Sequence, residues 1–279
     1  DDDHVAGIPM FQKEFDCPCY TDQQMLDVLT HPTAWRLPCV FPTPIRVDRP
    51  MEDGQSWLWH EFKLTSYFYP GQTLYHAALL VEHDDLRMFF VGDSHTMGGI
   101  DDYCAYNRNW LGRHVGFQYC LDLVERLQPT HMFNCHVDDA FAFTADEIRQ
   151  LRSNLDRRES AFGQLVPWQH ANFATDASWV RCYPYTQQVK PGDHVSLEVV
   201  VTNHSAKAHA AACRVVLPAG LGGGSSAWGR GTVAAKSDGR LPVAFQVPPR
   251  TPAGRYVVPV DIQFDGRQLP QFAEAIVDV

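Results

Sequence analysis

The chain has 279 residues, of which 45% are hydrophobic and 20% are charged, so it is long enough for two globular domains. Its formal net charge of −10 argues against the nucleic-acid backbone as a main partner, because binding there needs a clustered basic face. No apolar run reaches the length of a transmembrane helix, so no membrane span is expected. The composition favours no particular oligomeric state.

The 8 cysteines are scattered, and none forms a C-x-x-C pair. Cys17 and Cys19 are two residues apart, so in a strand they would point the same way and either form a strained contact or bind a soft metal. The favoured alternative is that the thiols are buried and act as small hydrophobic side chains. The redox compartment is therefore left open.

The first part of the chain begins with helical signals. Apolar residues recur at helical spacing over residues 5–15, which predicts a helix. Cys17–Tyr20 is expected to form a short strand, and Asp22 to cap a second helix that ends at Leu29. Residues 32–55 are rich in proline and contain an Asp-Gly pair, so they are predicted to be loop and turns.

Strand-like segments come next. Ser56–Tyr69, Leu74–Glu82 and Arg87–Val91 are each predicted to be a strand, and Asp84-Asp85 indicates a hairpin between the last two. Residues 104–127 are expected to be helical.

A strand and a capped helix close the first part. Thr130–Cys135 is predicted to be a strand, followed by a helix over Thr144–Arg158. Thr144 with Glu147 three residues later forms a capping-box pattern at the start of that helix. Residues 1–175 are therefore expected to form an α/β domain.

The pattern changes at residue 176, and residues 176–279 are predicted to be an all-β sandwich. Alternating segments are separated by turns such as Pro191-Gly192-Asp193 and Gly222–Ser226, with no helical periodicity. The expected strands are Val195–Thr202, Cys213–Leu217, Val243–Val247, Tyr256–Phe264 and Phe272–Val279.

This second part resembles an Ig-like bacterial accessory domain. The resemblance lies in Lys190-Pro-Gly-Asp, a strand ending in Thr202-Asn203, and then Leu217-Pro218-Ala219-Gly220. Such modules bind, space or orient, and nothing in this one indicates catalysis. The resemblance favours a bacterial periplasmic or extracellular location.

The N-terminus carries the first candidate ligands. Asp3, His4 and Gly7, ahead of an amphipathic stretch, resemble the end of the H-x-H-x-D-H motif of the metallo-β-lactamase superfamily. That motif gathers hard and borderline ligands in one tight loop just past a strand end. The resemblance would place Asp1 at the second His position and the first motif His before it. We therefore expect the chain to be a fragment or one chain of a cleaved protein, with part of the αββα fold missing.

Later segments follow in the order of this superfamily, over about residues 1–160. Pro70-Gly-Gln-Thr matches a segment that typically reads Pro-Gly-His-Thr and supplies a ligating His. Gln72 stands at the position of that His and offers only a weak amide oxygen as a ligand. His76, four residues later, either takes over as a ligand or is an ordinary His in a sheet.

The segment Phe89-Phe-Val-Gly-Asp93-Ser is an apolar strand that delivers Gly-Asp at its end. The superfamily places its bridging carboxylate there, where one group can bind two cations about 3.5–4 Å apart. The alternative for Asp93 is a turn residue or helix cap. His95 could face the site as a supporting or substitute ligand. Asp101, Asp102 and Tyr103 are expected either to line the mouth of the site or to form a solvated loop.

Thr130-His-Met-Phe-Asn-Cys-His136 is a strand that ends in His, which matches the last ligand of the superfamily. His136 is therefore the candidate, whereas His131 at the start of the strand is expected to be structural. His60 has no motif around it and is interpreted as a core or surface residue.

The resemblance implies two sets of metal ligands. Asp3, His4, Asp93 and His136 would form one set with an open position, whereas Asp1, His76 and the His before the chain would form the other. Such ligands suit one or two zinc ions, with iron or manganese as alternatives. In this reading a metal-bound hydroxide attacks the substrate, and Asp3 holds and orients it and shuttles a proton.

The leading hypothesis is a metal-dependent hydrolase that cleaves an ester, thioester, lactone, amide or phosphoester of a small molecule. The alternative is a non-catalytic metallo-β-lactamase-like binding or adhesion protein that acts through its β-sandwich, which Asp1 and Gln72 at expected His positions favour. A third is that the chain folds only with its upstream half. Aromatic residues between Trp57 and Trp110 would suit an apolar or sugar-like ligand, although core packing is the commoner role.

Overall fold

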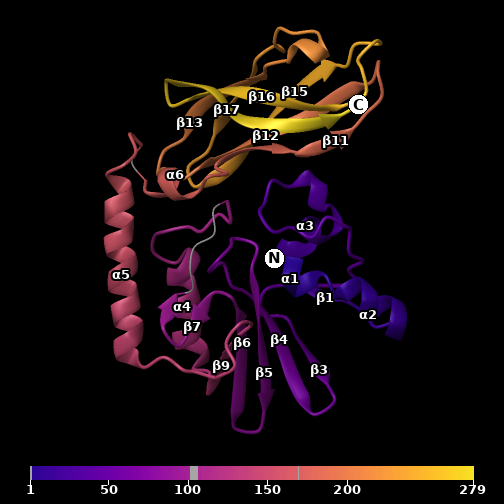
Figure 1. The fold of residues 1–279 in the computed structure, drawn as a ribbon. Helices are drawn as coiled ribbons and strands as arrows, with labels where there is room; N and C mark the ends of the chain where they lie inside the picture. The colour runs from indigo at the N-terminus through magenta and orange to yellow at the C-terminus, as the bar shows by residue number, and fades with distance from the viewer. Residues whose placement is uncertain (1, 101–105, 169) are drawn as a thin grey trace. The chain divides into compact units, whose positions relative to one another are not determined.

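The structure is a computed structural model that describes residues 2–100, 106–168 and 170–279. It divides into two compact units (Figure 1). The first unit comprises Asp1–Pro32 and Leu37–Asp176, and the second comprises Thr33–Arg36 and Ala177–Val279. The sequence predicted a boundary between residues 175 and 176. It did not predict that the segment Thr33–Arg36 belongs to the second unit.

The first unit opens with short elements. These are α1 (Asp2–Val5), α2 (Ile8–Phe15), β1 (Tyr20–Asp22), the 3-10 helix η1 (Gln23–Met25), α3 (Leu26–Thr30), the 3-10 helix η2 (Pro32–Ala34), which runs into the second unit, and β2 (Arg49–Met51). The helix predicted over residues 5–15 is present but shorter, since α2 begins at Ile8. Pro9 has no backbone N–H and is suited to begin a helix rather than continue one. The predicted strand begins at Tyr20 rather than Cys17. The predicted cap is confirmed, since Asp22 Oδ1 accepts from Gln24 N–H at 2.9 Å.

A five-stranded sheet forms the centre of the first unit, in the order β3-β4-β5-β6-β9. The strands are β3 (Ser56–Trp59), β4 (Phe62–Phe68), β5 (Ala77–His83), β6 (Leu86–Gly92) and β9 (His131–Asn134). Neighbours are antiparallel except for β6 and β9, which are parallel. The hairpin predicted at Asp84-Asp85 is confirmed. The single strand predicted over residues 56–69 is wrong, because the chain reverses at His60, whose φ is 53°.

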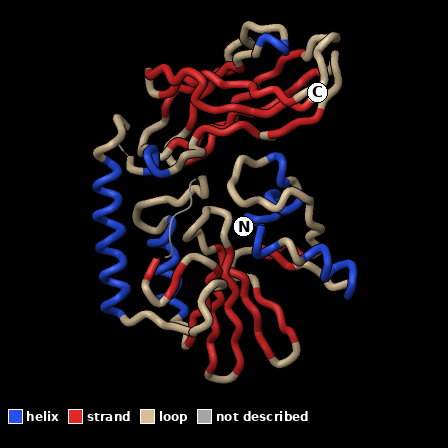
Figure 2. Tube along the Cα trace, viewed as in Figure 1, coloured by secondary structure: helices blue, strands red, loops and turns tan. Residues whose placement is uncertain are grey.

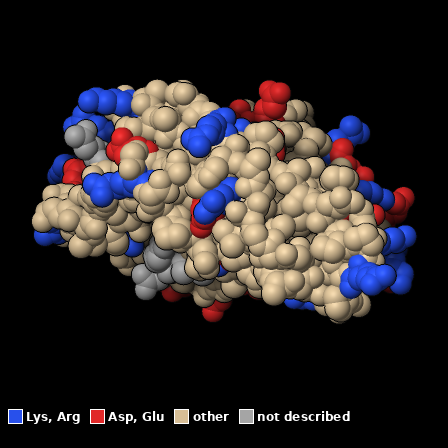
Figure 3. All heavy atoms as spheres, turned by 90° about the horizontal axis from the view of Figure 1, so that it is seen from above, with Lys and Arg blue, Asp and Glu red and all other residues tan. Residues whose placement is uncertain are grey.

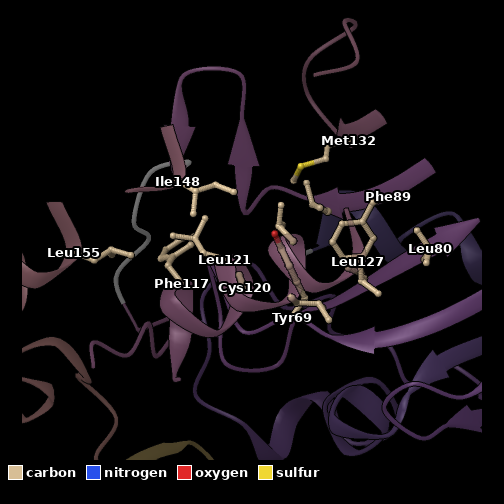
Figure 4. Packing of buried hydrophobic residues seen from close by; sticks show 14 of the residues in the cluster. Tyr69, Leu80, Phe89, Phe117, Cys120, Leu121, Leu127, Met132, Ile148 and Leu155 are labelled. Atoms are coloured by element: carbon tan, nitrogen blue, oxygen red, sulfur yellow. The ribbon is translucent and has the colours of Figure 1, made fainter. Parts of the chain in front are cut away.

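Helices lie beside this sheet (Figure 2). They are α4 (Gly116–Leu127) and α5 (Ala145–Gly163), and the short α6 (Asn172–Thr175) packs against α5. Strands β7 (His95–Thr96) and β8 (Gly99–Ile100) form a separate two-stranded sheet after β6. Apolar side chains of α4 pack with those of β5, β6 and β9 in the core shown in Figure 4. Its labelled members are Tyr69, Leu80, Phe89, Phe117, Cys120, Leu121, Leu127, Met132, Ile148 and Leu155.

The helix predicted over residues 104–127 is shorter, since α4 begins at Gly116. Gly116 has φ +53°, and a Cβ there would lie 1.9 Å from Trp110 O, so this close turn admits only glycine. Residues 106–115 contain no helix, and residues 104 and 105 lie outside the described chain. The α/β class predicted for this unit is nevertheless confirmed.

The capping box predicted for α5 is present. Glu147 N–H donates to Thr144 Oγ1 at 3.3 Å, and Thr144 N–H donates to Glu147 Oε2 at 2.7 Å. Replacing Thr144 with Ala is therefore expected to lower the free energy of unfolding of the first unit by about 1 kcal/mol. Urea unfolding measures this, with Ser160→Ala on the exposed surface of the same helix as control. An effect of Thr144→Ala no larger than that of Ser160→Ala would contradict the role of the cap.

The second unit contains two sheets. One has the order β10-β12-β15 and the other β11-β17-β16-β13-β14. The strands are β10 (Val180–Tyr183), β11 (Thr186–Gln188), β12 (His194–Asn203), β13 (His209–Val215), β14 (Gly229–Val233), β15 (Ser237–Gln246), β16 (Arg255–Phe264) and β17 (Arg267–Asp278), with the 3-10 helix η3 (Ala219–Leu221) between β13 and β14. The described residues 177–279 therefore form a two-sheet β unit, as predicted, while its Ig-like character stays a prediction.

Three strands were missed, namely β10, β11 and β14, and β15 begins at Ser237 rather than Val243. Glycine lowers strand propensity, which hides β14 and the start of β15 in the sequence. In the structure a Cβ at Gly239 would lie 2.6 Å from the Val233 side chain. Glycine is thus required at position 239 by the close approach of β14 to β15, not by a turn.

Charged side chains are interspersed on the molecular face in Figure 3, where Lys and Arg are not gathered into one stripe. That nucleic acids are not a main partner stays a prediction drawn from the net charge. Among the described residues, no helix combines the length and the apolar character needed to cross a membrane.

Candidate metal centre

Four side chains from three places in the first unit bring their donor atoms together. Asp3 and His4 lie on α1, Asp93 follows β6, and His136 follows β9. The two imidazole Nε2 atoms are 3.4 Å apart, and each lies 3.2 Å from Asp93 Oδ1. Asp3 Oδ2 lies 3.5 Å from His4 Nε2 and 3.4 Å from His136 Nε2. The residues named from the sequence as one ligand set therefore converge.

Sheet topology explains why Asp93 and His136 are neighbours. Strands β6 and β9 run parallel, with Gly92 paired to Asn134, so the segments that follow the two strands begin at the same end of the sheet. Asn134 then fixes the turn that follows, because its Oδ1 accepts from His136 N–H at 2.7 Å and its Nδ2 donates to His95 O at 3.1 Å.

Helix α1 differs from the loop expected at this position. Asp3 and His4 lie within a helix of 4 residues, Asp2–Val5, which Asp2 N–H ties to Cys39 O at 2.7 Å. Adjacent side chains of a helix point about 100° apart. Asp3 and His4 therefore reach one centre because that centre lies beside the helix, between the two directions. The N-terminal turn also favours the negative charge of Asp3.

Asp93 is the buried member of the set. Its side chain is 7% exposed, against 51% for Asp3 and 55% for His136. Its Oδ1 has no hydrogen bond of acceptable geometry with any described residue, although two imidazole nitrogens lie at 3.2 Å. A buried carboxylate oxygen without a hydrogen-bond donor needs another electrophilic partner, and a cation between the three atoms would be one.

Close donor distances join His4 and His136 to each other, to Asp93 and to Asp3. Five of the six separations fall between 3.2 and 3.5 Å. Three donor atoms with such separations can all lie about 2.0 Å from one zinc ion, which is the bond length of zinc to His nitrogen and carboxylate oxygen. The residues present therefore fit zinc.

Charges within the cluster reinforce one another. The close contact with the Asp93 carboxylate raises the pKa of His4 above its usual value, although burial acts against this. Burial acts to raise the pKa of Asp93, but the contact with His4 and the nearby imidazoles hold that pKa below its usual value. Asp93 is therefore ionised at neutral pH, as a metal ligand must be.

His76 lies beside the cluster rather than in it. Its Nδ1 is 3.1 Å from Ser94 Oγ, and neither group of converging donor atoms among the described residues includes it. Burial lowers its pKa to about 4, so the ring is neutral. Gln72 donates its backbone N–H to the same Ser94 Oγ at 3.2 Å. Metal binding by His76 or by the Gln72 side chain stays a prediction that this geometry does not favour.

Gly92 makes room for the His76 ring. A Cβ at Gly92 would lie 2.3 Å from His76 Nε2, and its φ is +53°. Gly92→Ala is therefore expected to destabilise the first unit by about 1–2 kcal/mol and, by displacing Asp93, to weaken zinc binding about tenfold or more. Urea unfolding and chelator competition measure the two effects. Gly163→Ala is the control, because nothing lies within 4 Å of a Cβ there; equal behaviour of the two variants would contradict the argument.

The other histidines lie elsewhere. The interpretation of His95 as facing the site is wrong, because its ring is fully buried in the core beside Phe117 and Phe143. Its Nδ1 lies 3.0 Å from Tyr69 OH, and burial lowers its pKa to about 3. His131 and His60 are exposed, the latter in the β3–β4 turn.

One potential ligand was not identified from the sequence. Cys135 Sγ, His4 and Asp93 place ligand atoms within 4.8 Å of one another. Its position next to His136, directly after a strand, was the available signal. Burial raises the pKa of this thiol, as do the negative charges of Asp93 and Asp3, so without a metal it is a protonated thiol at neutral pH.

Several residues named from the sequence lie outside the described chain. These are Asp1, Asp101, Asp102 and Tyr103. The ligand role predicted for Asp1, and the expected position of the other three at the mouth of the site, stay predictions.

No protein family model matches the sequence, and no curated protein matches it. Solved structures similar to this chain include metallo-β-lactamases. GOB-18 from Elizabethkingia meningoseptica is 14% identical, with a TM-score of 0.39 over 56% of this chain and 65% of that chain. The Cronobacter sakazakii enzyme with a HARLDQ motif is 17% identical, with a TM-score of 0.42 over 56% and 68%. The class B3 di-zinc enzyme LRA-12 from an Alaskan soil metagenome is 14% identical, with a TM-score of 0.39 over 56% and 67%.

The chain spans about two thirds of the length of these enzymes, 65% in the case of GOB-18. The likeness is one of fold at low identity. The ligand assignment below rests on the donor geometry of this chain itself.

Proposed function

We propose that the chain is a metal-dependent hydrolase in which Asp3, His4, Asp93 and His136 hold one zinc ion. The observation that carries this proposal is the set of five donor separations between 3.2 and 3.5 Å that join His4 and His136 to each other, to Asp93 and to Asp3. Two imidazoles and two carboxylates suit zinc, and iron or manganese are alternatives of the same ligand chemistry.

A bound zinc ion supplies an acidified water and polarises a carbonyl or phosphoryl oxygen. The residues of the chain supply the rest. Asp93 is buried and ionised, so it anchors the positive charge at the sheet edge. His4 is held by both Asp93 and Asp3, which orients its Nε2 toward the centre.

Asp3 is the candidate catalytic residue. Its Oδ2 lies 3.5 Å from His4 Nε2 and 3.4 Å from His136 Nε2, and we assign its Oδ1 to orient a water molecule and accept its proton. Asp3 and His136 are also the exposed members of the set, at 51% and 55%. Substrate is therefore expected to approach from their side. The bond cleaved would be an ester, thioester, lactone, amide or phosphoester of a small molecule.

A second candidate is a non-catalytic binding or adhesion protein that acts through an Ig-like second unit. Gln72 at a position expected to be His, and His76 outside the converging donor atoms, favour it because they leave a second metal set incomplete. This candidate predicts that the chain binds no metal.

The test is reconstitution of the chelator-treated full chain with zinc, followed by metal analysis and assay against one substrate of each bond class. The proposal predicts one zinc per chain and hydrolysis of at least one substrate in proportion to zinc content. A folded chain that takes up no zinc would overturn the proposal and favour the binding protein. His131→Ala serves as the control for nonspecific loss of an exposed imidazole.

A further inference from the structure

An apolar cavity of about 60 Å³ lies within the first unit, beside α1 and α3. Val28 and Leu29 of α3 form part of its wall, and Leu37, Val40 and Ile45 of the following loop form another part. Most of this wall is aliphatic. A cavity of this composition binds hydrocarbon better than water.

The cavity adjoins the candidate metal centre. Val5, which follows His4 on α1, lines it, and so does His76. The His76 ring lies against Gly92, the residue before Asp93, since a Cβ on Gly92 would meet His76 Nε2 at 2.3 Å. One wall residue, Val5, thus follows a proposed ligand in the chain, and another, His76, packs against the residue before a second proposed ligand.

The polar part of the cavity is small and specific. Among the described residues that line it, none is Asp, Glu, Lys or Arg. Asn107 lines it, is 2% exposed, and its Nδ2 has no hydrogen-bond partner among the described residues. A buried amide N–H without an acceptor is unfavourable, so a ligand that brings an oxygen gains a hydrogen bond at no competing cost.

The backbone holds Asn107 in place without using its side chain. Its carbonyl accepts from Leu74 N–H at 3.1 Å. Asn109, two residues on, is the useful contrast, because its Nδ2 donates to Gly71 O at 2.8 Å. The side-chain amide of Asn109 thus has a hydrogen-bond partner, whereas the Nδ2 of Asn107, a residue that lines the cavity, has none among the described residues.

We propose that this cavity binds an uncharged aliphatic acyl group of the substrate, with Asn107 Nδ2 donating a hydrogen bond to an oxygen of that group. As a substrate assignment this rests on the proposed hydrolase function, whereas binding by the cavity does not need the metal. The substrate class is therefore a neutral acyl ester, thioester or lactone with an aliphatic chain.

Binding is tested with 2-hexanone, an uncharged and unreactive probe that carries a carbonyl oxygen and a short chain. Titration of the full chain, followed by NMR with and without zinc, is expected to show saturable shifts in both forms. Asn107→Leu is expected to weaken binding about five- to tenfold, which corresponds to one hydrogen bond. Val40→Trp, which fills the cavity, is expected to abolish it, and Leu165→Trp, at a residue 73% exposed, should leave it unchanged. Absence of saturable binding, or equal binding by Val40→Trp, would overturn the proposal.

Hydrolysis separates this proposal from the proposed function. Zinc-loaded chain is compared on 4-nitrophenyl acetate and 4-nitrophenyl hexanoate. A kcat/KM at least tenfold higher for the hexanoate, lost in Val40→Trp, is the expected result. Zinc-dependent hydrolysis with no preference between the esters would overturn the acyl assignment alone. Ketone binding in a chain that takes up no zinc would overturn the hydrolase function and leave the cavity as a binding site.

Discussion

Replacing His136 with Ala is expected to weaken zinc binding at least about a hundredfold, because changes in residues that merely support a ligand already cost about 10–100-fold. His136 Nε2 lies 3.2 Å from Asp93 Oδ1 and 3.4 Å from both His4 Nε2 and Asp3 Oδ2, so its loss removes one corner of the donor set. The same reduction is expected for His4→Ala. Competition with a chromogenic zinc chelator measures both.

The matched control is His131→Ala, at the start of β9, whose exposed imidazole belongs to neither group of converging donor atoms. Its zinc affinity should stay within about twofold of the unmodified chain, since the four proposed ligands remain. If His136→Ala binds zinc as tightly as His131→Ala, His136 is not a ligand and the tetrahedral set is wrong.

Replacing Asp176 with Ala is expected to lower the free energy of unfolding of the first unit by about 3–5 kcal/mol. The side chains of Arg108 and Asp176 are 2% and 0% exposed and form a two-pronged pair, with Nε–Oδ1 at 3.0 Å and Nη2–Oδ2 at 2.9 Å. Trp110 Nε1 also donates to Asp176 Oδ2 at 3.1 Å. The variant leaves a buried guanidinium without its counterion. This is less favourable than replacing both members of the pair with apolar residues.

Hydrogen exchange of peptides from β5 and β6 reports the stability of the first unit separately from that of the second. Lys63→Ala is the control within the same unit, because Lys63 pairs with Glu82 at 3.0 Å but is 53% exposed. Exposed pairs contribute at most about 1 kcal/mol. Equal protection in the two variants would show that the buried pair does not hold Arg108 and its loop in place.

Local patterns made part of this structure predictable. The capping box at Thr144 and Glu147 and the turn at Asp84-Asp85 each depend on neighbouring residues, and both are present. The candidate ligands Asp93 and His136 were named because each ends a predicted strand where the resembled superfamily carries a ligand. That a parallel pairing of β6 and β9 brings the two strand ends together is a long-range property, which no local spacing contains.

The misses also have physical causes. His95 alternates with Asp93 in sequence, but the chain turns after β6, so its ring enters the core beside Phe117. Cys135 was grouped with the other scattered cysteines in the sequence. In the structure it precedes His136, and its thiol lies near His4 and Asp93 of the candidate metal centre. The turn at His60 was missed because His carries no turn signature, although its φ is 53°.

The most direct test of the central claim is zinc K-edge X-ray absorption of the chain loaded with one equivalent of zinc. The proposed ligands, two imidazoles and two carboxylates, predict four nitrogen and oxygen ligands at about 2.0–2.1 Å, with the outer-shell scattering of two imidazoles and no sulfur near 2.3 Å. A spectrum of hydrated zinc with about six oxygen ligands, or one without imidazole scattering, would show that His4, Asp93 and His136 do not share a cation.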